Sequence, residues 1–245
     1  MFSTFLLVIA VIITRLIASI AAAHGMMESD CAVGNLVMQG KLIIFEGVEG
    51  CGKTTQIQLT SQWLQSLGIE VVVTREPGGT ELGVDLRRLL LETGKNHIAS
   101  RTELLLYAAD RAQHVEQELK PNLASGKFVL CDRFIYSTIA YQGYGRSLDM
   151  DLINQLNQIA TAGLVSDLVF WFDLDAEVGL QRKRSSGEIA DRIEEEKIDF
   201  HKRVQQGYGE LAKTYPEFII RIDANLSKES IQQQIQDKLS KVIIN

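Results

Sequence analysis

The sequence has few cysteines, few prolines and no basic tract, and each shortage excludes a class of protein. Its three cysteines, Cys31, Cys51 and Cys131, are an odd number without a C-x-x-C spacing, which argues against a disulfide framework and against a zinc site. Only three prolines occur, and no low-complexity stretch or internal repeat marks a linker between residues 40 and 245. We therefore expect one domain in a reducing, cytoplasmic compartment.

The balance of charge does not favour binding to nucleic acid. The formal net charge is −6 at pH 7, and no run of lysine or arginine stands out. We expect no nucleic-acid partner, and only local positive charge at binding sites. The chain does contain 46% hydrophobic residues, which is enough for a sheet core that is covered on both faces.

The strongest motif follows an apolar run at residues 41–46. The sequence GVEGCGKTT at 47–55 fits the pattern G-x-x-x-x-G-K-[ST] between a strand-like and a helix-like segment. Its glycines let backbone N–H groups point inward, and the following helix adds its positive end. In this solvent-reached cradle, Lys53 can reach the β- and γ-phosphates of ATP, and the Thr54 hydroxyl can ligate Mg²⁺. The expected ATP-binding residues are Gly47, Val48, Glu49, Gly50, Cys51, Gly52, Lys53 and Thr54.

Downstream of this loop, helical and strand patterns alternate. Residues 56–67 carry apolar side chains at helical spacing and end at Gly68, and residues 69–74 form a β-branched run. A crossover of this kind makes a sheet parallel. We therefore predict the P-loop NTPase fold, an α/β domain with a five-stranded parallel sheet flanked by helices and a lid segment. The other predicted strands are 127–131, 167–173 and 217–223, and the other predicted helices are 81–91, 100–120, 149–161, 176–182, 193–214 and 227–241.

Two segments place polar residues at the carboxyl ends of predicted strands, the edge at which ligands bind in open α/β sheets. Arg75 begins a sharp turn, REPGGT, for which a plain turn is the alternative interpretation. Asp132 and Arg133 follow the strand at 127–131. The acid is suited to hold Mg²⁺ or its water shell, and the arginine to bind a phosphate with two hydrogen bonds; a solvated ion pair is the alternative.

The helix at 100–120 opens with Ser-Arg-Thr-Glu, which we interpret as a capping box of Ser100 and Glu103. Further along, Tyr107, Arg111 and His114 share one face of the helix. Tyr107 and Arg111 could stack on and hydrogen-bond a planar base, although spacing alone favours a core tyrosine and a solvated arginine. We expect His114 to be an ordinary surface or half-buried histidine.

Residues 182–192, RKRSSGEIADR, mix basic residues with small flexible ones. Such a segment can close over phosphates as a lid that excludes water and adds positive charge. A charge run alone more often forms a solvated surface loop.

Taken in order, these motifs make the chain similar to thymidylate kinases, P-loop enzymes that phosphorylate dTMP, from residue 41 to about residue 239. The resemblance rests on FEGVEGCGKTT at 45–55, TREPGGT at 74–80, LLYAADR at 105–111, Asp132 and Arg133 with Ser137, AYQG at 140–143 and DRIE at 191–194. The loop motif alone indicates only a P-loop NTPase, whereas the combination is far more specific.

The resemblance implies a binding site for the base and sugar of the acceptor. Tyr107 would stack on thymine and Arg111 would bond the carbonyl edge of the base. Thr138 or Gln142 would also contact the base. Tyr141 would lie against the sugar, where a ribose 2′-hydroxyl would clash.

For the phosphates, the resemblance implies that Arg133 and Arg75 hold the acceptor phosphate. Asp132 and Glu49 would organise Mg²⁺ and the acceptor. Many bacterial members have an acid at the position of Glu49 and supply the catalytic arginine from the lid, and this chain looks like that variant.

The lid departs in part from the family pattern. Arg182 and Arg184 match basic positions, whereas Ser186 stands where another arginine is usual, and the lid is slightly longer. We expect Arg184 to act in the transition state and Arg182 to contribute less, together with Lys53 and Mg²⁺. The family also implies a homodimer.

The implied reaction is ATP + dTMP → ADP + dTDP, a step toward dTTP, and two other functions compete with it. The nearest rival is another nucleoside or nucleotide kinase, such as a deoxynucleoside kinase. Arg133 and Arg111 disfavour it, because they suit an acceptor that already carries a phosphate and a pyrimidine. The rival from another class is a GTP-dependent switch or a regulatory ATP-binding module. No N-K-x-D motif occurs, which argues against the switch.

The chain begins with an apolar run at residues 5–23, broken by Thr14 and Arg15. A secretory signal would need positive charge before this run, and export would separate an ATP site from ATP. A membrane anchor would place Arg15 near its centre, which costs about 3 kcal/mol. We expect instead that residues 1–37 are a dispensable extension, from an upstream start codon, and that Met38 begins the kinase domain at 38–245. Any membrane association would be through residues 5–23.

Overall fold

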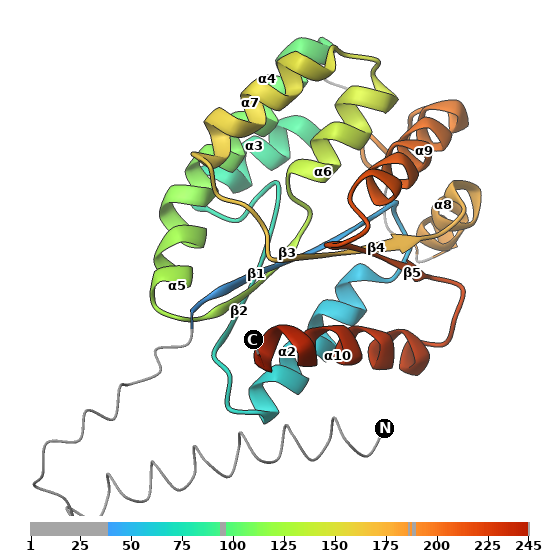
Figure 1. Cartoon of the computed structure of the whole chain (residues 1–245). Coiled ribbons are helices and arrows are strands. Elements are labelled where there is room, and N and C mark those ends of the chain that lie inside the picture. Colours follow the sequence, from blue (N-terminus) through green and yellow to red (C-terminus); the bar gives the residue numbers. More distant parts are fainter. Residues whose placement is uncertain (1–38, 94–96, 186, 188–189, 245) are drawn as a thin grey trace, which may run out of the picture.

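The sheet has five parallel strands in the order β2-β3-β1-β4-β5, which confirms the predicted architecture. The computed structural model describes residues 39–93, 97–185, 187 and 190–244. Strand β1 lies at the centre of the sheet, and helices cover both faces (Figure 1). The loop after β1 therefore opens at the middle of the carboxyl edge, beside the ends of β3 and β4.

The predicted strands are all present, and the helices follow them in the predicted order. The strands are β1 Lys41–Gly47, β2 Val71–Arg75, β3 Phe128–Asp132, β4 Leu168–Asp173 and β5 Ile219–Asp223. The helices are α2 Lys53–Ser66, α3 Glu81–Leu91, α4 Ser100–His114, α5 Lys120–Ala124, α6 Ile135–Thr138, α7 Met150–Thr161, α8 Ala176–Ser185, α9 Ile198–Thr214 and α10 Lys228–Ile244. Two π-helical stretches, η1 Val115–Leu119 and η2 Ile139–Gly145, continue α4 and α6.

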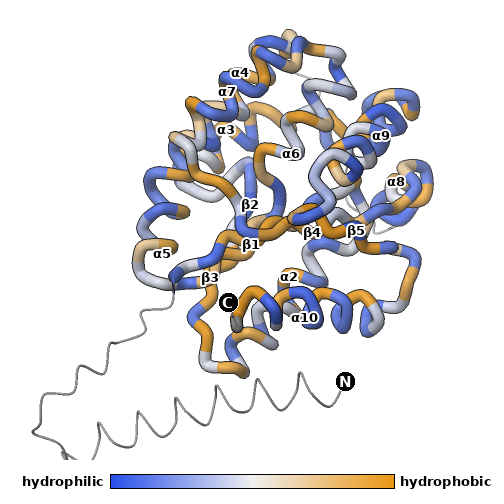
Figure 2. The backbone as a smooth tube through the Cα atoms, in the orientation of Figure 1, coloured by the Kyte–Doolittle hydropathy of each residue, from blue (hydrophilic) through white to orange (hydrophobic). Residues whose placement is uncertain are grey.

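Two hydrophobic clusters join the helices to the sheet. On one face, Ile43 of β1 belongs to a cluster with Ile57 of α2 and Ile235 of α10. On the other face, Leu42 and Ile44 belong to a cluster with side chains of η1 and α9. Strand β1 is buried on both faces, which explains why its sequence is continuously apolar and does not alternate. Figure 2 shows the central strands as a hydrophobic band between the helices.

Two helices differ most from their predicted bounds. The helix expected at 100–120 is interrupted after His114 by the π-helical stretch η1. The helix expected at 193–214 begins only at Ile198. Before it, Asp191 Oδ1 accepts the backbone N–H groups of Ile193 and Glu194, each at 2.9 Å, and so holds these residues in a turn.

The predicted capping box at the start of α4 is wrong. The residue before the helix is Ala99, and no side chain caps the helix. Glu103 is instead fully buried and accepts hydrogen bonds from Gln142, Arg146 and Arg192. Two arginines and an amide bind this carboxylate more strongly than one backbone N–H could.

In the part of the chain that the structure describes, no helix has the length and hydropathy needed to cross a membrane. The extension at 1–37, its apolar run at 5–23 and the start at Met38 lie outside the described residues. Their interpretation stays a prediction.

Candidate active site

The phosphate-binding loop connects β1 to α2, and its bends require glycine. Gly50 has φ +68° and Gly52 has φ +92°, left-handed conformations that other residues disfavour. A Cβ at Gly50 would also lie 2.2 Å from the carbonyl oxygen of Gly179 on α8. Helix α2 begins at Lys53, so its first N–H groups face the loop. The loop and the helix end together form a cradle for an anion.

Lys53 lies within the loop, not in the solvent-reached cradle that we expected. Its side chain is 7% exposed, and its Nζ donates to the carbonyl oxygens of Gly47 at 3.1 Å and Val48 at 3.0 Å. The nearest carboxylate oxygen of Glu49 is 3.9 Å away. A phosphate that enters the loop would therefore compete with these carbonyls for the ammonium group.

An open pocket of about 550 Å³ lies over the loop. Arg75 and Asp132, from the ends of β2 and β3, line it together with Arg182 of α8. Gly47 and Val48 are buried and are not among its lining residues. The other predicted ATP-binding residues do line it, namely Glu49, Gly50, Cys51, Gly52, Lys53 and Thr54.

Thr54 and Asp132 fit a Mg²⁺ site at this pocket. Both residues line it, Thr54 from the first turn of α2 and Asp132 from the end of β3. Asp132 Oδ1 is buried and has no hydrogen-bond partner among the described residues. A buried carboxylate oxygen is unfavourable unless a cation or its water shell pairs with it, and Mg²⁺ prefers hard oxygen ligands of this kind.

A second, smaller pocket of about 70 Å³ adjoins the first. Glu49, Glu76, Arg87, Arg133 and Asp191 line both pockets, so the two share a wall. Of the residues predicted to bind the acceptor, only Arg75 does not line this pocket. Those that do are Tyr107, Arg111, Arg133, Thr138, Tyr141 and Gln142.

Glu49 and Arg133 form an ion pair on the wall that the pockets share. Tyr141 supports the pair twice, because its hydroxyl donates to Glu49 Oε1 at 3.2 Å and its ring centre lies 5.0 Å from the Arg133 guanidinium. Burial raises the pKa of Glu49, but the charges of Arg133 and Lys53 outweigh burial and hold this pKa below its usual value. Glu49 is therefore an anion at the meeting point of the two pockets.

Glu46, which our sequence analysis did not single out, orders the turn that carries Arg133. It is fully buried in β1 and accepts the N–H of Phe134 at 2.8 Å. The hydroxyls of Ser137 and Tyr208 donate to its other oxygen at 2.6 and 2.7 Å. Burial raises the pKa of Glu46 in spite of these bonds. The network holds Arg133 at φ +73°, a strained conformation for a residue with a side chain.

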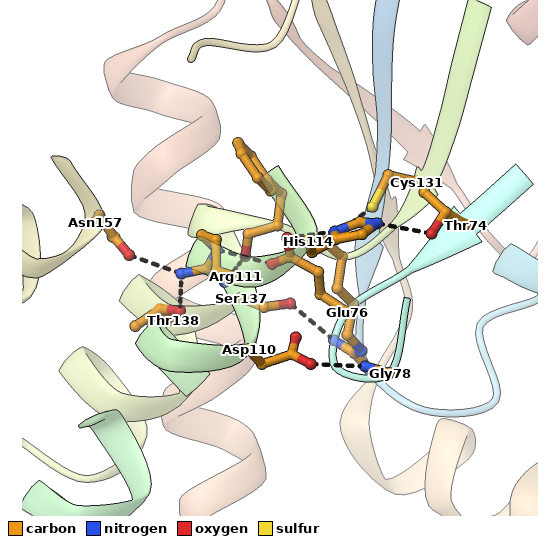
Figure 3. Close-up of polar contacts among 12 residues, drawn as sticks. Thr74, Glu76, Gly78, Asp110, Arg111, His114, Cys131, Ser137, Thr138 and Asn157 are labelled. Atoms are coloured by element: carbon orange, nitrogen blue, oxygen red, sulfur yellow. Dashed lines mark hydrogen bonds and ion pairs between the residues drawn. The ribbon is translucent and has the colours of Figure 1, made fainter. Parts of the chain in front are cut away.

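Arg111 is held by the protein on several sides (Figure 3). Its Nε donates to Glu76 at 2.7 Å, and its Nη1 donates to Thr138 at 2.9 Å and Asn157 at 2.8 Å. Its Nη2 donates to the carbonyl oxygen of Phe134 at 3.0 Å. With 2% of its side chain exposed, Arg111 is not the solvated arginine that spacing alone favoured. It reaches the acceptor pocket from within a fixed network.

His114 is fully buried, so the expected surface or half-buried histidine is wrong. Its ring nitrogens hydrogen-bond Glu76 at 2.9 Å and Thr74 at 2.7 Å (Figure 3). Glu76 therefore binds both His114 and Arg111 and fixes α4 against the turn after β2. Spacing placed Tyr107, Arg111 and His114 on one face but could not show what that face packs against.

Arg87 of α3 lines both pockets and was not predicted. Its Nη1 donates to the carbonyl oxygen of Pro77 at 3.1 Å. Burial and the nearby charge of Arg75 lower the pKa of Arg87. Two guanidinium groups that face one pocket suit a polyanion. No motif marks Arg87, because it is one of two adjacent arginines on an amphipathic helix.

The two lid arginines differ in position. Helix α8 is capped by Asp175 and extends to Ser185, beyond its predicted end at residue 182. Both arginines are exposed, but Arg182 lines the phosphate pocket and Arg184 does not. Residues 186, 188 and 189 of the lid lie outside the described residues.

Comparisons with known proteins agree with this geometry. A family model for thymidylate kinase matches residues 45–235. The thymidylate kinase of Nostoc punctiforme is 70% identical over 203 residues, which cover 82% of this chain and 96% of that protein. The thymidylate kinase of Trichodesmium erythraeum is 59% identical over 214 residues, or 81% of this chain and 94% of that protein. The crystal structure of thymidylate kinase from Ehrlichia chaffeensis superposes with a TM-score of 0.66 at 34% identity, over 82% of this chain and 98% of that one. The chain therefore belongs to the thymidylate kinase family.

Proposed function

We propose that this protein transfers the γ-phosphoryl group of ATP to dTMP, giving ADP and dTDP, with Mg²⁺ bound at the phosphate pocket. The observation that carries the proposal is the shared wall of the two pockets, where Glu49 and Arg133 meet. One pocket holds a glycine-rich cradle and the other holds an aromatic ring beside hydrogen-bonding side chains. Two substrates that occupied them would bring their phosphates together at this wall.

On the donor side, loop N–H groups and Lys53 bind the phosphates of ATP. Thr54 and Asp132 would hold Mg²⁺, which when bound would neutralise charge on the transferred phosphoryl group. Arg182 and Arg184, in the lid, add positive charge that stabilises the negative charge of the transferred phosphoryl group. Little covalent chemistry falls to the protein, so positioning and charge stabilisation account for catalysis.

On the acceptor side, Tyr107 stacks on thymine, and Thr138 and Gln142 contact the base. Tyr141 lies against the sugar. Arg111 already makes four hydrogen bonds with its five N–H groups, which leaves one on Nη2 for a carbonyl of the base.

For the acceptor phosphate, we assign Arg133 and Arg75, which line the phosphate pocket. Arg133 also supports dTMP as acceptor over thymidine, because a half-buried guanidinium on the shared wall suits a group that already carries phosphate. The homodimer, which the family resemblance implies, and the cytoplasmic location, which the cysteine content indicates, are part of this proposal.

The test measures ADP formation with dTMP, thymidine, dUMP and no acceptor. We expect turnover with dTMP, a weaker reaction with dUMP and almost none with thymidine. Preferred turnover with thymidine would identify a nucleoside kinase instead. Nucleotide hydrolysis without any acceptor preference would support the regulatory module.

A further inference from the structure

Glu103, on α4, is fully buried and receives four hydrogen bonds. Gln142 Nε2 donates to its Oε1 at 2.8 Å. Arg146 donates twice, from Nε and Nη2, each at 3.1 Å, and Arg192 Nη2 donates to its Oε2 at 2.6 Å. Burial raises the pKa of Glu103, but the hydrogen bonds of Arg146 and Gln142 and the charge of Arg146 outweigh burial and lower it. The side chain is therefore a carboxylate, which can only accept hydrogen bonds.

An acceptor-only neighbour fixes the orientation of the Gln142 carboxamide. The amino group must face Glu103, so the carbonyl oxygen Oε1 faces the other way. Gln142 is 2% exposed and lines the acceptor pocket. Among the described residues, the structure gives Oε1 no hydrogen-bond donor. The pocket therefore presents an unpaired acceptor to an incoming base.

The carboxylate is itself held in place, so it cannot turn away from Gln142. Arg146 also pairs with Glu196, and its guanidinium lies 4.6 Å from the ring centre of Phe200. Arg192 also donates from Nε to the carbonyl oxygen of Leu90 at 2.7 Å. Both arginines can only donate, and Nη2 of each donates to Oε2, whereas Oε1 is shared by Gln142 and Arg146 Nε.

We propose that Glu103 is a positioning residue for base selection, which holds Gln142 so that the pocket accepts a ring N–H and thereby favours thymine over cytosine. This inference rests on the proposed placement of the base. Thymine carries a hydrogen at N3, whereas N3 of cytosine carries a lone pair. Opposite a fixed carbonyl oxygen, thymine completes a hydrogen bond. Cytosine would place its N3 lone pair, a second acceptor, opposite this oxygen. The ring nitrogen and the carbonyl oxygen would then both be buried without a hydrogen bond.

The variant Glu103→Gln tests this orientation directly. Its oxygen would accept from Nη2 of Arg146 and Nη2 of Arg192, and its amino group, in the place of Oε1, would donate to Gln142 and give up the hydrogen bond from Arg146 Nε. The Gln142 carboxamide would then turn and present N–H to the pocket. We expect kcat/KM for dTMP to fall roughly tenfold to a hundredfold, while kcat/KM for dCMP holds or rises. A structural role alone would lower both values equally, so an unchanged dTMP to dCMP ratio would overturn the proposal.

Two further variants separate the orientation of the Gln142 carboxamide from a general disturbance of the polar cluster around Glu103. Arg146→Lys is the matched control, because it loosens the same cluster but leaves the acceptor of Gln142 in place, and it should keep the wild-type ratio. Gln142→Met has no carboxamide to turn, so adding Glu103→Gln to it should not change its ratio further. The ratio of the double variant is compared with that of Gln142→Met, and the ratio of Glu103→Gln with that of the wild type. If the two shifts are equal, Gln142 does not transmit the effect of Glu103 and the proposal fails.

An analogue of dTMP with C–H in place of N3–H tests the base placement in the unaltered protein. We expect it to lose about tenfold or more in kcat/KM. If it reacts as well as dTMP, the base does not lie against Gln142, and both the placement and the inference fail. If it is weakened while Glu103→Gln keeps the wild-type ratio, the placement stands and only the role of Glu103 is overturned.

A measurement on the wild type covers the case in which Glu103→Gln does not fold. The side-chain amide protons of Gln142 face Glu103, so their NMR signals should exchange slowly with solvent even without nucleotide. Binding of dTMP should change this protection by less than about twofold. Protection that arises only when dTMP binds would show that the amino group faces the base, contrary to the proposal.

Discussion

The carboxylate of Glu49 and the guanidinium of Arg133 pair on the wall between the two pockets, so the donor loop and the acceptor site share one ion pair. Arg133 also donates to the hydroxyls of Ser137 and Tyr208, each at 3.2 Å. An arginine whose charge is already balanced binds a phosphate less tightly than a free one. Glu49 therefore favours a fixed position of Arg133 over maximal affinity for the acceptor.

Glu49→Gln should lower kcat more than it weakens the binding of dTMP. The amide has the same size as the carboxylate but no longer balances the charges of Arg133 and Lys53. The enzyme should therefore bind the phosphates of its substrates at least as tightly, while Arg133 is no longer held in the position that the reaction needs. We expect kcat to fall by about a hundredfold, with KM for dTMP equal or lower. Steady-state kinetics at saturating ATP gives both constants. Glu81→Gln, at an exposed acid of α3, is the control and should change neither. A raised KM with normal kcat would contradict the argument.

Tyr141 allows a paired test of sugar selection. Its ring packs beside Arg133, and its hydroxyl bonds Glu49. Tyr141→Phe removes only the hydroxyl, whereas Tyr141→Ala also removes the ring that would block a 2′-hydroxyl. We expect the preference for dTMP over its ribonucleotide analogue to persist in the first variant and to fall about tenfold in the second. The measurement is the ratio of kcat/KM values. A wild-type ratio in Tyr141→Ala would show that the ring does not select the sugar.

Local patterns were sufficient to predict the fold and many residues of the phosphate pocket. The apolar run of β1, the glycines after it and the crossover to β2 depend on neighbouring residues alone. Parallel strands bring their carboxyl ends to one edge, which is why Arg75 and Asp132 meet at the phosphate pocket. The resemblance then supplied the residues of the acceptor pocket, which no periodicity could assign to a ligand.

Buried polar partners could not be predicted, because they lie far apart in the sequence. Glu46 meets Tyr208 across 162 positions, and Glu103 meets Arg192 across 89. A single acid inside an apolar strand was a signal for Glu46, since such an acid must be paired or hydrogen-bonded. For Glu103 the sequence offered a misleading signal, because a capping box has the same spacing.

The lid arginines differ in a way that kinetics can measure. The sequence favoured Arg184 as the transition-state cation, but Arg182, and not Arg184, is among the residues that line the phosphate pocket. We now expect Arg182→Ala to lower kcat about a thousandfold with little change in KM, and Arg184→Ala to cause a smaller loss. If Arg182→Ala instead raises KM for ATP at normal kcat, Arg182 only binds ATP. A larger kcat defect in Arg184→Ala would restore the sequence-based prediction.

Asp110 should give the stability of the fold a pH dependence. Its Oδ1 accepts the N–H of Gly78 at 3.0 Å, whereas its Oδ2 is buried without a hydrogen-bond partner among the described residues (Figure 3). Burial and the neighbouring charge of Glu76 raise the pKa of Asp110 from 3.8 to about 6. The folded protein therefore binds a proton at this site more tightly than the unfolded chain does.

A carboxyl whose pKa rises on folding stabilises the protein fully below its ordinary pKa, here 3.8, and the stabilisation is lost as the pH rises through about 6. Asp110→Asn keeps the acceptor for Gly78 but cannot ionise. Between about pH 4 and pH 7, the unfolding free energy of the wild type should fall relative to this variant, by on the order of 3 kcal/mol at most. Urea unfolding at several pH values measures the difference. Asp151→Asn, at an exposed acid of α7, is the control and should follow the wild type. Parallel profiles for Asp110→Asn and the wild type would show that Asp110 is ionised throughout this range.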